Sequence, residues 1–164
     1  MISRPLIGAL LLGAAISPLH AEPSAEPSVE RGRYLVLVGG CNDCHTPGYP
    51  ESGGKLPQKD WLTGSPVGFQ GPWGTTYAGN LRLSAQALDE THWLKLARSP
   101  LRPPMPSPSL AAMSDDDLRS IYRFIRGLGA AGSAAPVYAP PGQAVATPFI
   151  EFVPKNLPAQ VAQP

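Results

Sequence analysis

The chain has 164 residues, of which 15% are charged and 43% are hydrophobic, and its formal net charge is +1. This is the length of one domain. The balanced charge excludes a disordered acidic tail and a nucleic-acid-binding protein with a basic face. The 21 Pro and 17 Gly residues argue against long uninterrupted helices and broad sheets. We therefore expect short helices joined by well-defined turns, in a chain that needs another component to complete its core.

Residues 1–21 have the pattern of an export signal. Arg4 supplies a positive charge, an apolar run extends from Leu6 to Ile16, and Pro18 ends it. The run has the length of a signal peptide and is too short to span a bilayer. We predict cleavage near Ala21 and export to the periplasm; the alternative is an uncleaved membrane anchor. Cleavage would remove one basic residue of 13 and leave a formally neutral chain, because 12 residues are acidic.

The first predicted helix follows a short exposed linker over residues 22–28. Ser28 is suited to the N-cap position, and Glu30 lies in the first turn, where the helix dipole favours a negative charge. Gly39 and Gly40 end the apolar period. Gly32 allows another helix to approach closely, and Tyr122 or Phe124 is expected to fill that crossing.

The chemistry comes directly after this helix, as Cys41-Asn42-Asp43-Cys44-His45. Cys-x-x-Cys-His is the attachment sequence of a c-type heme. Its two thiols add to the two vinyl groups of one porphyrin, and the histidine then lies under the iron. We predict one heme c, bound covalently through Cys41 and Cys44 and ligated by His45. The alternatives are a thioredoxin-type redox pair and a plain disulfide, but Pro- and Gly-rich sequence follows instead of alternating strands and helices.

Three side chains beyond residue 45 could supply a second axial ligand. Met105 lies between prolines in Pro104-Met105-Pro106, which are expected to fix an extended backbone and to present the thioether. Met113 precedes Ser114, an N-cap for a helix whose first turn is Asp115-Asp116-Asp117, and is suited to a hydrophobic staple with Leu118. His92 lies near the start of a helix predicted from about Asp89 to Arg98. We favour Met105, with Met113 and His92 as the alternatives.

The helix that starts after Ser114 is the clearest in the chain. Its apolar residues follow the spacing i, i+3, i+4, i+7, and it ends at Gly127 or Gly129. The opposite face carries Arg119, Arg123 and Arg126, which could form a docking patch, although a solvated face is the favoured interpretation.

Aromatic residues interrupt the Gly- and Pro-rich stretch between residues 46 and 83. They are Trp61, Phe69, Trp73 and Tyr77. Trp73 and Tyr77 carry polar atoms that could bind heme propionates; packing in an ordinary core is the equal alternative. Arg82 or Arg102 could pair with a propionate. Residues 131–164 are Pro-rich without a helical period but retain apolar side chains, which predicts an extended tail against the domain or against a partner.

The order of these features resembles class I cytochromes c. Gly74-Thr75-Thr76-Tyr77, Asn80-Leu81, a helix with Trp93 and Arg98, Pro104-Met105-Pro106 and the Met113–Leu118 segment are similar to one heme module of the cytochrome subunits of bacterial periplasmic alcohol and aldehyde dehydrogenases. Those subunits usually carry three modules and a membrane anchor, whereas this sequence has one attachment motif. The resemblance implies an all-α class I cytochrome c domain over residues 29–130, with Cys41 and Cys44 carrying the heme and His45 and Met105 ligating it.

A heme with two protein ligands has no position open for a substrate, and methionine ligation raises its reduction potential. We therefore expect a periplasmic one-electron carrier without catalytic residues, free or as a subunit. It would take electrons from a dehydrogenase and pass them to an oxidase or another cytochrome. The alternative is a heme enzyme or gas sensor with a labile distal ligand. Nucleic acid is not expected as a partner, and a membrane only through a partner or an uncleaved signal segment.

Overall fold

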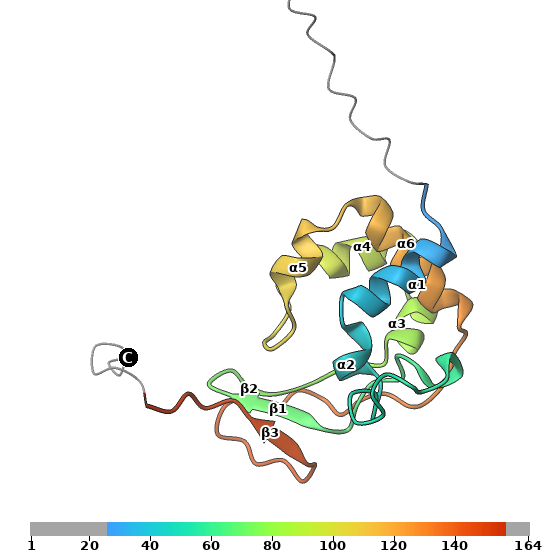
Figure 1. Ribbon diagram of the computed structural model, residues 1–164. Coiled ribbons are helices and arrows are strands. Elements are labelled where there is room, and N and C mark those ends of the chain that lie inside the picture. Colours follow the sequence, from blue (N-terminus) through green and yellow to red (C-terminus); the bar gives the residue numbers. More distant parts are fainter. Residues whose placement is uncertain (1–25, 157–164) are drawn as a thin grey trace, which may run out of the picture.

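A computed structural model describes residues 26–156 (Figure 1). The predicted signal segment and most of the predicted linker lie outside the described residues. The helices are α1 (Val29–Val38), α2 (Cys41–His45), α3 (Leu81–Ala87), α4 (Glu90–Arg98), α5 (Ser107–Ala112) and α6 (Asp115–Gly127), with a short 3₁₀ helix at Gln58–Asp60. The strands are β1 (Gly68–Gly71), β2 (Gly74–Tyr77) and β3 (Phe149–Glu151). No helix among residues 26–156 is both long enough and apolar enough to cross a membrane.

Helices α1 and α6 cross in close contact. A Cβ atom built on Gly32 would lie 1.9 Å from the backbone oxygen of Ser120 and 2.8 Å from Cβ of Phe124, so a side chain cannot fit there. This confirms the predicted close approach and identifies Phe124 as the aromatic at the crossing. Arg31 and Asp117 form a 2.9 Å ion pair at its edge.

The two predicted helix caps, Ser28 and Ser114, are present in the structure. Ser28 accepts a hydrogen bond from the Arg31 N–H at the start of α1, and Ser114 accepts one from Asp117 at the start of α6. Asp89 caps α4 in the same way through the His92 N–H. Because each cap fixes where its helix begins, the sequence-based starts of these three helices are correct.

The apolar core of the described residues lies between α1, α3, α4 and α6. Its members are Leu35, Val36, Trp61, Leu62, Ala85, Trp93, Ala97, Leu118, Ile121, Tyr122, Phe124 and Ile125. Trp61 packs edge-on against Phe124, with ring centroids 6.4 Å apart, and Trp93 packs against Tyr122 at 5.8 Å. Trp61 is therefore an ordinary core aromatic, whereas Phe69 and Trp73 lie in a different part of the molecule.

The expectation of an all-α fold is wrong in one respect, because the described residues include a three-stranded sheet in the order β2-β1-β3. β1 and β2 form an antiparallel hairpin with Phe69 opposite Thr76, and β3 adds to β1 in parallel with Ile150 opposite Phe69. The Gly- and Pro-rich composition concealed both hairpin strands, each of only four residues, which suits the short element lengths that such composition allows. The molecule is thus mostly helical with a small sheet.

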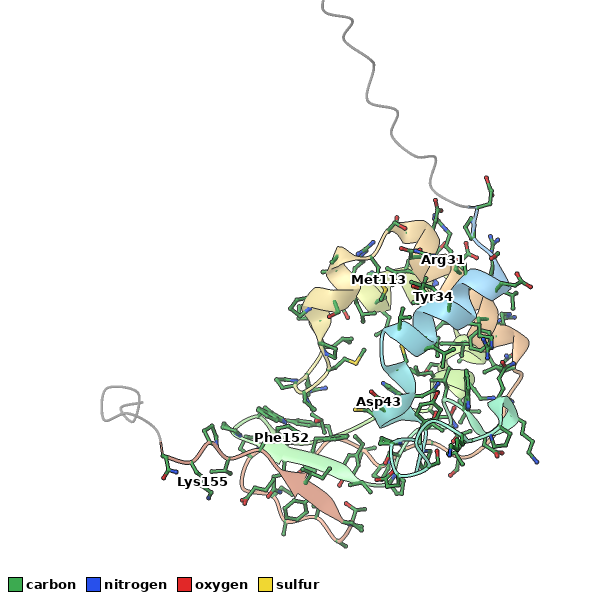
Figure 2. All side chains as sticks on the ribbon, viewed as in Figure 1. Arg31, Tyr34, Asp43, Met113, Phe152 and Lys155 are labelled. Carbon is green, nitrogen blue, oxygen red and sulfur yellow. The ribbon has the colours of Figure 1, made fainter. Side chains whose placement is uncertain are left out.

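Residues 131–156 run back along the molecule and supply the third strand (Figure 1). Asn80 donates hydrogen bonds to the carbonyls of Ala131 and Ser133, and Phe152 donates from its backbone N–H to Gln70. The ring of Phe152 lies 6.0 Å from both Phe69 and Trp73 (Figure 2). Phe152 of the tail therefore packs against aromatic side chains of the hairpin, whereas Val137 is 87% exposed.

Candidate functional site

The Cys-x-x-Cys-His sequence forms one short helix, α2, immediately after α1. Gly39 donates its N–H to Leu35 and closes α1, and Gly40 has a φ of 65°, a left-handed conformation that glycine adopts without steric cost. The chain then turns into α2, where Cys41 and Cys44 are three residues apart and share a face. Cys41 is half-buried, Cys44 is exposed, and both are free thiols.

His45 is buried and held by a single carbonyl. Its Nδ1 lies 2.7 Å from the backbone oxygen of Gly79, just after β2. Because a carbonyl can only accept, Nδ1 carries the proton and Nε2 keeps its lone pair. Burial lowers the pKa of His45, and the Gly79 hydrogen bond offsets this only in part. His45 is therefore a neutral imidazole with a fixed ring and a free ligating nitrogen.

Both thiols are protonated at neutral pH in the heme-free chain. Burial is the main cause that raises the pKa of Cys41, to about 11, and the charge of Asp43 adds to it. The pKa of Cys44 is also raised, first by burial and then by the charge of Asp43. A thioredoxin-type pair depends on a cysteine with a lowered pKa, so the electrostatics of this pair disfavour that alternative.

Hydrogen bonds fix α2 to the segment that follows the 3₁₀ helix. The hydroxyl of Thr46 donates to Oδ1 of Asn42 at 2.7 Å. The Oγ1 atom of Thr46 also accepts a hydrogen bond from the N–H of Leu62 at 2.7 Å. The N–H of Gly64 donates to the carbonyl of His45 at 2.8 Å. The short helix that presents both thiols and the imidazole is thus held from its buried side.

Met105 lies on a turn and not on the extended backbone that its flanking prolines led us to expect. The N–H of Met105 donates to the carbonyl of Arg102 at 3.2 Å, and Ser107 donates to the carbonyl of Met105 at 2.8 Å. Thr76 of β2 donates from Oγ1 to the carbonyl of Pro103 at 2.7 Å. The turn is therefore compact, and the half-buried Met105 projects from a segment attached to β2.

Met113 packs against the apolar core, where Leu118 also lies, as a hydrophobic staple requires (Figure 2). A Cβ atom built on Gly39 would lie 3.7 Å from Cε of Met113 and 3.8 Å from Sγ of Cys41. The Met113 side chain therefore lies near the end of α1. His92 is on the surface, where Nδ1 pairs with the carboxylate of Asp89 at 2.9 Å. Each of the two alternative ligands thus has a structural role of its own.

The four candidate propionate partners all have protein partners. Trp73 donates from Nε1 to the carbonyl of Phe69 at 3.3 Å, and the hydroxyl of Tyr77 lies 2.6 Å from Oγ1 of Thr147. Arg82 is buried and donates to the carbonyls of Lys59, Leu128 and Gly129.

Arg102 places its guanidinium 4.1 Å from the ring centroid of Tyr138. Two of these residues lie on the hairpin, and Arg102 is three residues before Met105 in the chain. Arg82 lies on α3, and its side chain reaches the carbonyls of Leu128 and Gly129 just after α6.

Three contacts that support the site were not predicted from the sequence. The carbonyl of Gly79 orients His45, Thr76 holds the segment before Met105, and Tyr138 stacks on Arg102. Backbone acceptors carry no residue-type pattern, and Tyr138 lies in a Pro-rich segment without periodicity. Only Thr76 stood within a stretch already recognised as similar to the heme modules.

The donor set fits a covalently bound heme. Two free thiols at i and i+3 are followed by an imidazole whose outer nitrogen is unprotonated, which is the group that a c-type heme requires for attachment and for its first axial bond. No group of three or more His, Cys, Asp or Glu side chains among residues 26–156 could hold a metal ion directly.

Comparisons with known proteins agree with this chemistry. The chain is 28% identical over 129 residues to the cytochrome c subunit of a quinone-dependent alcohol dehydrogenase from Gluconobacter oxydans, covering 70% of this chain and 24% of that protein. It is 28% identical to the fructose dehydrogenase cytochrome subunit of Gluconobacter japonicus, over 71% of this chain and 25% of the relative. It is 29% identical to the gluconate 2-dehydrogenase cytochrome c subunit of Pantoea cypripedii, over 71% and 27%.

The chain thus spans about a quarter of the length of the curated relatives it matches. No protein-family model and no solved structure matches it. In class, the chain resembles a cytochrome c. More particularly, it resembles one portion of the cytochrome c subunits of alcohol, fructose and gluconate dehydrogenases, which confirms the resemblance found from the motifs.

Proposed function

We propose that this chain is an electron-transfer cytochrome with one heme c, attached covalently to Cys41 and Cys44 and ligated by His45 and Met105 in a class I arrangement. The observation that carries the proposal is the 2.7 Å contact of His45 Nδ1 with Gly79, in a helix that also presents the two free thiols. The similarity to cytochrome c subunits supports it independently.

The heme, when bound, supplies a reversible one-electron couple, and a methionine ligand raises its potential. The chain contributes orientation of the ligands. Gly79 fixes the tautomer and ring of His45, which increases its basicity as a ligand. Thr76 holds the Met105 turn three residues earlier on the same stretch of chain. Because the two proposed ligands are held by one extended segment, little rearrangement is expected when the electron arrives or leaves.

For the two propionates we propose donors among Trp73, Tyr77, Arg82 and Arg102. Each already has a protein partner, so binding a carboxylate requires sharing or exchanging that partner. Binding a propionate would disrupt the most hydrogen bonds at Arg82, because three of its nitrogens donate to backbone carbonyls inside the protein. Trp73 and Tyr77 donate or share only one hydrogen bond each.

We propose the periplasm as the location, on the export pattern of residues 1–21, and a redox protein as the partner. The relatives are named as cytochrome subunits of alcohol, fructose and gluconate dehydrogenases. By analogy, a periplasmic dehydrogenase is the proposed electron donor, and an oxidase or another cytochrome is the proposed acceptor. In this proposal the chain would hold the heme, and the dehydrogenase would bind the substrate.

The test is to produce the chain with the c-type heme attachment machinery and to examine the purified protein. We expect heme to remain with the polypeptide after denaturation, a low-spin ferric spectrum with the charge-transfer absorption of methionine ligation, and no rapid binding of carbon monoxide by the ferrous form. A high-spin ferrous form that binds carbon monoxide at once would overturn the carrier and favour a heme enzyme or gas sensor. Loss of the heme on denaturation would overturn covalent attachment.

A further inference from the structure

The C-terminal segment is fixed to the β1–β2 hairpin next to Met105. Ala139 and Thr75 exchange two backbone hydrogen bonds of 3.0 and 2.8 Å. A Cβ atom built on Gly74 would lie 2.3 Å from the carbonyl oxygen of Ala139, so the tail lies directly on the backbone of β2. Tyr138, the residue before Ala139, donates from its hydroxyl to the carbonyl of Trp73 at 2.9 Å. The ring of Tyr138 is therefore held at both ends.

The guanidinium of Arg102 stacks on the ring of Tyr138. The Arg102 Cζ lies 4.1 Å from the ring centroid of Tyr138, well within the range of a cation–π contact. Arg102 opens the turn that ends at Met105, because its carbonyl accepts the Met105 N–H. Pro103, the next residue, accepts the hydrogen bond from Thr76. The turn is thus fixed to the rest of the molecule at two points, β2 and the tail.

We propose that Tyr138 is a positioning residue for Met105, through its stacking on Arg102. The inference rests on the proposed role of Met105 as an axial ligand. An external ligand can reach the iron only after the thioether moves away, and that movement displaces the turn. A turn restrained by Tyr138 moves away less often than one restrained by Thr76 alone, so the tail lowers the rate of ligand exchange. Tyr138 would thereby keep the carrier closed to small molecules.

The experiment measures the rate at which imidazole binds to the ferric holoprotein, together with the methionine charge-transfer absorption. Tyr138→Leu removes both the ring and the hydroxyl, and it should raise the binding rate by about threefold to tenfold, as expected for the loss of one cation–π contact. Tyr138→Phe keeps the ring and should restore a rate close to that of the wild type. Arg102→Gln should raise the rate as Tyr138→Leu does, and the double variant should be no faster than either single one.

The matched control is Thr147→Val, which removes a different hydroxyl contact between the tail and β2, the 2.6 Å contact with Tyr77. It should leave the imidazole rate unchanged. The proposal is overturned if Tyr138→Leu binds imidazole at the wild-type rate, or if Thr147→Val accelerates binding as much as Tyr138→Leu. A change in Arg102→Gln alone would instead assign Arg102 to a propionate.

Failure of the underlying ligand assignment gives a different result. In that case the wild type itself shows no methionine absorption, or Met105→Ala leaves that absorption intact, before Tyr138 is changed. If the methionine absorption depends on Met105 but the imidazole binding rate is unchanged in Tyr138→Leu, the positioning role alone is refuted.

Discussion

Nδ1 of His45 lies 2.7 Å from the carbonyl oxygen of Gly79, across 34 residues of sequence. Three residues before Gly79, the hydroxyl of Thr76 donates to the carbonyl of Pro103. At about 3.3 Å per residue in extended chain, the two attachment points are roughly 10 Å apart. The stretch from Thr76 to Gly79 therefore contacts both the helix that carries His45 and the turn that carries Met105. Strand β2 of the small sheet, which was not expected from the sequence, leads into this stretch and positions both segments.

Replacing Gly32 by alanine should destabilise the holoprotein strongly. The new Cβ would lie 1.9 Å from the backbone oxygen of Ser120, so α1 and α6 must separate. Overpacking of this kind costs about 3 kcal/mol. Denaturant unfolding of the two proteins measures the difference.

Gly127→Ala is the matched control, because no atom lies within 4 Å of a Cβ at that last residue of α6. It should be neutral or slightly stabilising, since alanine favours the helix. Equal stability of Gly32→Ala and Gly127→Ala would show that the helix crossing is looser than described.

Arg98 connects α4 to the end of α5 and the start of α6. It donates to the carbonyls of Leu110, Ala111 and Met113 and to the carboxylate of Asp115 at 2.7 Å. Arg98→Gln should cost about 1–2 kcal/mol at neutral pH. Lys95→Gln is the control, because the side chain of Lys95 is exposed on the same helix and makes no hydrogen bond or ion pair within the described part of the chain.

The effect of Arg98→Gln should depend on pH. Arg98 holds the pKa of Asp115 below its ordinary value of 3.8, so this contribution to stability is present above that value and is lost as the pH falls through the lower folded-state pKa. Urea unfolding at neutral pH and near pH 3 should show a smaller difference between variant and wild type in acid. A difference that grows in acid would contradict the assigned ion pair.

Local signals in the sequence were sufficient for the starts of α1, α4 and α6, whereas the short helices α2, α3 and α5 were not predicted. Ser28, Asp89 and Ser114 each cap the helix predicted to follow, because a cap is an interaction among residues three apart. The Cys-x-x-Cys-His motif likewise identified the chemistry, since its spacing is itself the requirement of the heme. These features depend on neighbours in sequence and not on the fold.

What the sequence concealed depends on distant pairs. β3 joins β1 across about 80 residues in a Pro-rich segment, and nothing local indicates that partner. The carbonyl of Gly79 has no residue type that would identify it as the acceptor for His45. The prolines around Met105 were interpreted as fixing an extended backbone, but the hydrogen bond from the Met105 N–H to the carbonyl of Arg102 makes the segment a turn.

The heme should be part of the folding core. Cys41→Ala combined with Cys44→Ala prevents covalent attachment, and we expect the resulting chain to be poorly folded, because a chain with 21 Pro and 17 Gly buries little surface without its cofactor. Thermal unfolding followed by circular dichroism provides the comparison with the heme-loaded wild type. A cooperative transition of the double variant near the wild-type midpoint would be inconsistent with this expectation.

Electron transfer to the natural partner should depend weakly on salt. Residues 42–47 and 101–108 carry few charges apart from Asp43 and Arg102, and we expect them to form an apolar docking patch around the heme edge. The competing surface is the arginine face of α6. There Arg119 and Arg123 both pair with Glu90, at 3.0 and 3.3 Å, which reduces its positive field.

Stopped-flow kinetics can distinguish the two surfaces. The Debye length falls from about 30 Å at 0.01 M salt to about 8 Å at 0.15 M, so a charged docking face loses its attraction over this range. We expect little change in the rate. A drop of about tenfold or more would assign docking to the arginine face.

The most direct test of the account is the ferric absorption spectrum of Met105→Ala beside that of Met113→Ala. Met105 lies on a compact turn held by Thr76, whereas Met113 packs against the core as the staple before α6. We expect Met105→Ala to abolish low-spin methionine ligation and Met113→Ala to keep it, with the heme still covalently bound in both. Loss of the methionine absorption in Met113→Ala and its persistence in Met105→Ala would contradict the assignment of the axial ligands.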